Sequence, residues 1–205
     1  MLCRKGAVVR KEKIEKLVCR DKGKDEYTKY SSYQCSSIES LSAPIKKTLT
    51  RVPPSFGSCA MISAGLVSIL EVEYSIPAIA VLGDLNIQGS SVFKCRDNLP
   101  LENQSNEALV QNWDGHCWVE VDSIICDLSI FRTAYRINKP SVLRSYILST
   151  FGEGKGAFVS PIESLPQDIE FVPKFVLNKD QISGLLCGLS EQQRNSNQWG
   201  QTRLI

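Results

Sequence analysis

Histidine is almost absent from this chain, which has one, His116, among its 205 residues. Imidazole is the side chain that ordinarily changes its charge near neutral pH, so acid–base chemistry through histidine can occur here at this position alone. The chain also lacks any run approaching the ~18 apolar residues that a membrane-spanning helix needs, which predicts no membrane anchor. The basic N-terminus has no apolar segment after it, so no secretory signal is expected. A net charge of +2 favours no class of partner.

Eight cysteines are present, at irregular spacing. A disulfide scaffold is typical of shorter secreted chains, and several of these cysteines fall in segments expected to form the core, where cysteine behaves as a small apolar residue. We therefore expect free thiols and a cytoplasmic location. An apolar share of 42% is enough for one sizeable core, and we expect a single domain over residues 31–190. A basic helical segment at 1–30 precedes it, and a polar tail at 191–205 follows.

The basic segment, residues 1–30, carries ten Lys or Arg and five Asp or Glu, a local net charge of +5. Its apolar positions Val8, Ile14, Leu17 and Val18 predict an amphipathic helix that packs on the edge of the domain. Basic clusters also attract phosphates. A nucleic-acid-associated protein that uses this segment is therefore an alternative, although nucleic acid is not the partner we expect.

The stretch around His116 predicts a β-hairpin. Residues 116–121 and 124–128 are rich in strand-favouring side chains, with the polar pair Asp122-Ser123 between them. Pairing about that turn gives one wholly apolar face, which we expect to be core: Cys117, Val119, Val121, Ile124, Cys126 and Leu128. His116 and Asp127 are then diagonal neighbours on the other face. A carboxylate in that position can orient the imidazole and stabilise its cation.

Cys59 is the candidate nucleophile. Residues 59–70 are apolar almost all round, which predicts a helix buried on every side, and Ser58 is a suitable N-cap. Cys59 then lies in the first turn, where the positive end of the helix dipole favours a thiolate. Its backbone N–H is free to donate to an oxyanion, and Gly57 permits a tight approach of the chain. Nucleophile, base and orienting group are then Cys59, His116 and Asp127.

The remaining segments complete an α+β pattern: an antiparallel sheet packed on a central helix, with further helices flanking. Helices are expected at 44–50, 142–151 and 180–189, and strands at 76–82, 91–95 and 169–177. Polar or glycine-rich loops are expected at 23–43, 83–111 and 152–160, and substrate choice is expected to lie in the last two.

Three motifs together resemble the transglutaminase-like branch of the papain-like superfamily. They are Gly57-Ser58-Cys59 opening an apolar helix, His116-Cys-Trp118-Val-Glu120 on a strand, and Asp127-Leu-Ser on the next strand. The resemblance covers residues 55–130 and implies a papain-like, transglutaminase-core fold. It also implies a cysteine peptidase, amidase or acyltransferase in which Cys59 attacks, His116 is the base and Asp127 orients it. The substrate would be a peptide, protein or small acyl compound, and no cofactor is expected. The Arg-Gly-Gly run that usually precedes the cysteine in the related arylamine N-acetyltransferases is absent.

Three further residues are assigned to substrate binding: Gly57, Ser58 and Trp118, the last of which walls the site or packs under it. Glu120 is expected to be solvated or paired with a lysine. A zinc site of His116, Cys117, Cys126 and Cys95 is disfavoured, because adjacent residues on a strand point to opposite faces. A non-catalytic binding or regulatory protein on the same fold is the second alternative.

Overall fold

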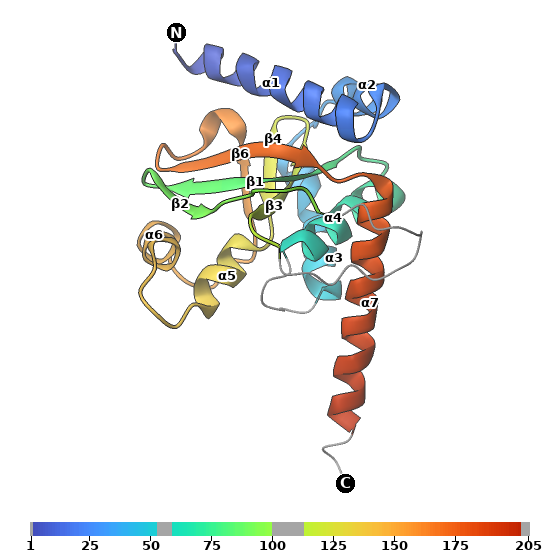
Figure 1. The fold of residues 1–205 in the computed structure, drawn as a ribbon, viewed down its shortest axis with the longest axis vertical. Helices are drawn as coiled ribbons and strands as arrows, with labels where there is room; N and C mark the ends of the chain where they lie inside the picture. Colours follow the sequence, from blue (N-terminus) through green and yellow to red (C-terminus); the bar gives the residue numbers. More distant parts are fainter. Residues whose placement is uncertain (1, 53–58, 100–112, 202–205) are drawn as a thin grey trace.

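The computed structural model describes residues 2–52, 59–99 and 113–201 of the chain. It is a mixed α+β fold with a six-stranded antiparallel sheet (Figure 1). In chain order the elements are α1 (Leu2–Asp21), α2 (Lys24–Ser32), the 3₁₀ turn η1 (Ile38–Leu41), α3 (Ser42–Arg51), α4 (Cys59–Glu73), β1 (Ile79–Ile87), β2 (Ser90–Phe93), β3 (His116–Val121), β4 (Ile124–Asp127), α5 (Ile130–Arg136), α6 (Val142–Phe151), β5 (Phe158–Pro161), the 3₁₀ turn η2 (Ile162–Ser164), β6 (Ile169–Val176) and α7 (Lys179–Gln201).

β1 is the central strand of the sheet, and β6 pairs along one of its edges. On the other edge, β3 pairs with the first half of β1, as far as Gly83↔His116, and β2 pairs with the second half, from Leu85↔Phe93. β4 and β5 follow beyond β3. The two strands β2 and β3 therefore meet on one edge of β1, and the ends that carry Phe93 and His116 adjoin.

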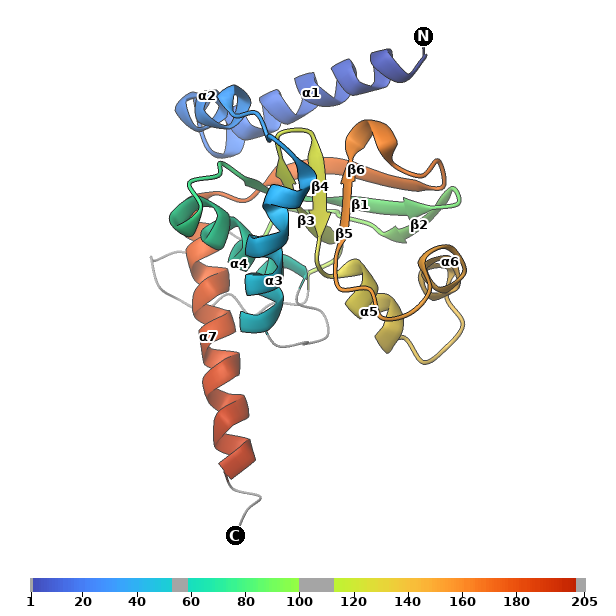
Figure 2. The ribbon, with the colours of Figure 1, turned by 180° about the vertical axis from the view of Figure 1, so that it is seen from behind.

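Both faces of the sheet are buried, each in its own apolar cluster. Helices α3, α4 and α7 cover one face, while α1 and α2 at one end and α5 and α6 at the other cover the opposite face (Figure 1; Figure 2 shows the fold from behind). All six residues of β3 are buried in consequence. A polar side chain on this strand must find its partners inside the protein.

The hairpin prediction is confirmed. Val119 pairs with Cys126 and Val121 with Ile124, and Asp122 in the turn between them has φ 54°. All six residues predicted for the core face belong to the cluster under α4. The central helix is also confirmed as α4, which is buried along most of its length and packs on β3, where the Ser63 hydroxyl donates to the carbonyl of Cys117 at 3.2 Å.

Several predicted boundaries agree with the structure, and others are wrong. The helix at 142–151 is α6, the strand at 169–177 is β6, and the amphipathic N-terminal helix is α1, with Ile14, Leu17 and Val18 buried. The side chain of Val8 lies outside the described residues. The loop predicted over residues 23–43 is wrong, because α2 and η1 form there. Polar composition suggested a loop, but α2 is held by tertiary contact, since the buried Tyr30 donates to the carbonyl of Asp122 at 2.6 Å.

The loop predicted over residues 83–111 is also wrong in its first part. β1 continues to Ile87 and turns directly into β2, while residues 100–112 lie outside the described part of the chain. Helix α5 and strand β5 were not predicted. α7 runs past Leu189 to Gln201, so the segment predicted as a polar tail is helical as far as it is described.

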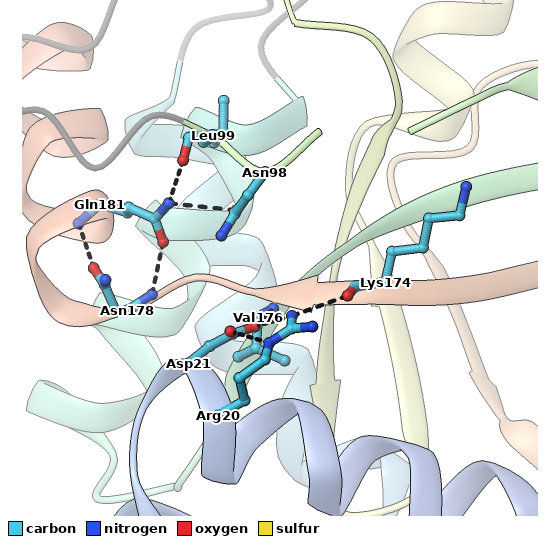
Figure 3. A network of polar contacts seen from close by, with 8 residues as sticks. All are labelled: Arg20, Asp21, Asn98, Leu99, Lys174, Val176, Asn178 and Gln181. Atoms are coloured by element: carbon cyan, nitrogen blue, oxygen red, sulfur yellow. Dashed lines mark hydrogen bonds and ion pairs between the residues drawn. The ribbon is translucent and has the colours of Figure 1, made fainter. Parts of the chain in front are cut away.

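Polar contacts fix two helix ends beside β6 (Figure 3): the start of α7, just after the strand, and the end of α1, which is bonded to the strand itself. The side chains of Asn178 and Gln181 each accept a hydrogen bond from the backbone N–H of the other, at 2.9 and 3.0 Å, which caps α7. On the other side of β6, Asp21 accepts from the backbone N–H of Val176 at 2.8 Å. The basic N-terminal helix is thus bonded to the sheet.

No helix in the described part of the chain is long and apolar enough to cross a membrane. The cysteines whose side chains are described all have free thiols: Cys19, Cys35, Cys59, Cys95, Cys117, Cys126 and Cys187.

Candidate active site

His116 is the first residue of β3, and two glycines make room around it. A Cβ on Gly83, its partner across the sheet, would lie 2.0 Å from the carbonyl oxygen of Val172. Gly115, directly before His116, has φ 123°, and a Cβ there would lie 2.8 Å from the Cβ of Cys95. A larger residue at either position would push apart the strands that fix the imidazole.

Asp127 holds the imidazole. Its Oδ2 lies 2.5 Å from Nε2 of His116, and both side chains are almost wholly buried. Its other oxygen, Oδ1, accepts three hydrogen bonds, from the backbone N–H and hydroxyl of Ser129, each at 2.9 Å, and from the N–H of Ile130 at 3.0 Å. The carboxylate is therefore fixed by the start of α5 and leaves one oxygen for the histidine.

The environment favours the charged forms of both groups. Burial by itself lowers the pKa of His116, but the charge of Asp127, the hydrogen bond to it and a hydrogen bond with Cys59 together raise that pKa to about 10. Burial by itself raises the pKa of Asp127, but His116 and the donors from Ser129 lower it below its usual value. The pair is an imidazolium and a carboxylate at neutral pH.

Cys59 completes the arrangement from the first turn of α4. Its side chain is partly exposed, and it lines the same pocket as His116. Since Nε2 of the imidazole faces Asp127, Nδ1 is the nitrogen left for the hydrogen bond with the thiol. The structure thus brings Cys59, His116 and Asp127 together, from a helix start and two paired strands. Gly57 and Ser58 lie outside the described residues.

The pocket beside Cys59 and His116 has a volume of about 400 Å³. The ring of Phe93 stacks on that of His116, with centroids 5.1 Å apart and planes 14° from parallel. The other lining residues come from β2, from the segment that follows it, from the residues just before β3 and from α5: Val92, Lys94, Arg96, Trp113, Asp114, Gly115 and Thr133. Val92, Lys94 and Arg96 lie in the 83–111 segment to which substrate choice was assigned, but the sequence did not single them out, because the pairing of β2 beside β3 brings them to the histidine.

Of the two positions expected for Trp118, walling the site or packing under it, the structure has the second, and Trp118 does not line this pocket. The side chain is fully buried, with its ring centroid 6.2 Å from that of His116 and 5.2 Å from that of Phe171. Its indole N–H donates to Oε1 of Glu120 at 2.9 Å. Trp118 therefore lies inside the protein behind the imidazole, where it packs and does not meet a substrate.

Glu120 was predicted to be solvated or paired with a lysine, and that prediction is wrong. It is buried, and its carboxylate binds the guanidinium of Arg10 on α1 as well as the indole of Trp118. Arg10 also donates to the carbonyl of Phe171. One face of β3 therefore carries a continuous series of contacts that runs from the imidazole through Trp118 and Glu120 to the N-terminal helix.

The pocket wall that includes Lys94 and Arg96 is bonded to the sheet. Asp84 on β1 accepts from the backbone N–H of Cys95 at 2.7 Å, and Lys174 on β6 donates to the carbonyl of Cys95 at 2.7 Å. The indole N–H of Trp113 donates to the carbonyl of Asp97 at 2.9 Å. Both ends of the segment that leaves β2 and returns to β3 are fixed near the histidine.

Nothing in this geometry resembles a metal centre. Within residues 2–52, 59–99 and 113–201, no group of three or more His, Cys, Asp and Glu side chains could hold a metal ion. Cys117 and Cys126 lie in the cluster under α4, whereas the imidazole of His116 lies on the opposite face of the hairpin.

Comparison with known proteins gives no relative: no protein-family model matches the chain, and neither do curated proteins or solved structures. The function must therefore be inferred from the chemistry of the site itself.

Proposed function

We propose that this chain is a cysteine-dependent acyl-transfer enzyme on a papain-like, transglutaminase-type fold. The observation that carries the proposal is the buried His116–Asp127 pair, hydrogen-bonded at 2.5 Å, beside a partly exposed thiol at the start of α4. Structural cysteines are usually inert and buried, whereas a nucleophile beside a base that a third group orients is the arrangement of covalent catalysis. A helix that presents Cys59 against the strand of His116, with Asp127 on the next strand, also agrees with the resemblance seen in the sequence.

In the first half of the reaction, the Cys59 sulfur attacks the carbonyl carbon of an amide, isopeptide or thioester. A C–S bond forms, the carbonyl π electrons move to oxygen, and the N–H of Cys59 is available to stabilise that oxyanion. The oxyanion then re-forms the carbonyl and the bond to the leaving group breaks. The His116 imidazolium gives its proton to the departing amine or thiolate, which leaves an acyl thioester on Cys59.

In the second half, His116 is neutral and acts as a base. It takes a proton from water or from an acceptor amine, whose oxygen or nitrogen attacks the thioester carbonyl. The C–S bond breaks, the acid or the new amide is released, and the thiolate–imidazolium pair is restored. Asp127 keeps the ring oriented throughout and stabilises its cation, without taking the proton itself.

The rival use of the basic segment in nucleic-acid binding has less support. Arg10 is directed into the domain toward Glu120, Arg20 binds Asp21, and Lys29 binds Glu26 at 3.0 Å. These three cations have anionic partners, whereas the exposed Lys11, Lys13 and Lys16 on α1 form no ion pair among the described residues, so the rival depends on them. We also propose a cytoplasmic location, because the described cysteines are free thiols and free thiols are typical of reducing compartments.

Alkylation with iodoacetamide at pH 6 tests the proposal. We expect Cys59 to be labelled first, with one label per chain, because it is a partly exposed thiol that lines the pocket beside the imidazole of His116. His116→Ala should abolish this preference, and the partly exposed Cys35 and Cys187 serve as internal controls. Equal labelling of all three cysteines, or no effect of His116→Ala, would leave a binding or regulatory protein on the same fold as the better account.

A further inference from the structure

Two cations line the pocket beside Cys59. Lys94 and Arg96 both contribute to its wall, and both are exposed. Within the described part of the chain, neither has a carboxylate partner within ion-pair distance. Asp114 is the one carboxylate among the described lining residues. The pocket wall therefore carries a net positive charge in addition to the buried His116–Asp127 pair.

These cations stand on a fixed backbone. The residue between them, Cys95, is buried, and both its N–H and its carbonyl are bonded to the sheet, through Asp84 and Lys174. Farther along, Gln181 donates to the carbonyl of Leu99 at 2.7 Å (Figure 3). A charge held on an ordered backbone loses little conformational freedom when a ligand binds, so it contributes more to recognition than a charge on a mobile loop.

We propose that this wall selects acyl donors that carry an anionic group, and that Lys94 and Arg96 determine this specificity. The inference rests on the proposed function and extends it to the class of substrate. A pocket of about 400 Å³ lies near the small end of the range for ligand sites, so it fits a short acyl donor bearing a carboxylate. Donors with a positive charge are repelled by the same wall, and neutral donors gain only the apolar contacts with Phe93 and Trp113.

Two matched pairs of esters test the proposal. They also show whether the wall recognises a carboxylate on the acyl group or one on the leaving group. In the first pair, 4-nitrophenyl hydrogen adipate is compared with 4-nitrophenyl methyl adipate, so the charge lies on the acyl group. In the second pair, 4-acetoxy-3-nitrobenzoate is compared with methyl 4-acetoxy-3-nitrobenzoate, so the charge lies on the leaving group. The released nitrophenolate gives kcat/KM for each ester.

We expect the charged member of at least one pair to be preferred. Exposed charge pairs are weak individually, so the Lys94→Gln/Arg96→Gln double variant should lower that preference by about fivefold. The preference should also fall at ~1 M salt, where the screening length is ~3 Å. Lys139→Gln is the matched control, because Lys139 is exposed on the loop between α5 and α6 and does not line the pocket. Asp114→Asn should raise the preference.

The outcomes separate this inference from the proposed function. If Cys59→Ala abolishes turnover of both pairs but the double variant leaves their charged-to-neutral ratios unchanged, the specificity is refuted and the catalytic proposal stands. If Cys59→Ala has no effect on turnover, both proposals are refuted.

Discussion

The Arg10–Glu120 ion pair behind the site gives a quantitative test of how α1 is joined to strand β3. The change is Arg10→Met, which keeps an unbranched apolar side chain and removes the cation. Glu120, with its side chain 1% exposed, is then left with the indole of Trp118 as its remaining described partner. Removing one member of a buried ion pair costs ~3–5 kcal/mol, because the other charge stays buried without compensation. Since the side chain of Arg10 is itself 15% exposed, we expect the lower end, about 3 kcal/mol.

Urea unfolding at pH 7, followed by far-UV circular dichroism, measures this loss. With a slope of about 2 kcal/mol per M urea, the midpoint should fall by about 1.5 M. Adding Glu120→Gln to Arg10→Met should restore part of the stability, because the uncompensated charge is removed. Lys29→Met, which breaks the exposed pair with Glu26, is the matched control and should leave the midpoint unchanged. An unchanged midpoint in Arg10→Met, or strictly additive effects in the double variant, would refute the structural role given to α1.

Three further predictions concern the site and the strand beneath it. Asp127→Asn should lower kcat for ester turnover by ~10²–10⁴-fold, because the carboxylate that orients His116 and stabilises its cation is lost. A kcat within about threefold of wild type would contradict this. Gly83→Ala should lower the free energy of unfolding by at least about 2 kcal/mol in urea, since the new Cβ would lie 2.0 Å from the carbonyl of Val172, and a neutral effect would count against the packing described. The charged pair should also make stability depend on pH at both ends. His116 has a raised pKa of about 10, so its contribution is complete below its unfolded value of ~6.5 and is lost as pH rises through about 10. The pKa of Asp127 is lowered, so its contribution is complete above ~3.9 and is lost as pH falls. Urea midpoints across pH should therefore fall at the alkaline end more steeply in the wild type than in His116→Gln; parallel curves would exclude a charged histidine.

The hairpin and the central helix could be predicted from the sequence because their signals are local. Side chains alternate between the two faces of the hairpin on either side of the turn Asp122-Ser123. This alternation alone puts His116 and Asp127 on the same face, where they meet. The apolar character of residues 59–70 likewise indicated a helix buried on every side, with Cys59 at its start.

What the sequence did not predict depends on partners far along the chain. Nothing local indicates that Glu120 would meet Arg10, 110 positions away, or that Trp118 would be covered completely. The two-sided burial of β3 arises only once α1, α5 and α6 lie over the second face of the sheet. For the same reason the sequence indicated the 83–111 segment but not which of its residues line the pocket, because Phe93 reaches His116 through the shared pairing of β2 and β3 with β1.

The meeting of β2 and β3 on one edge of β1 has a consequence for how this scaffold could be altered. The segment between these strands begins after Phe93, which pairs with Leu85 of β1, and ends before His116, which pairs with Gly83 of β1. Both of its ends are therefore held by neighbouring positions of one strand. Residues inserted into or deleted from its middle leave both anchor points in register. A library of segments of varied length could thus be exchanged there to change what the protein accepts, while the strands that position the histidine stay as they are.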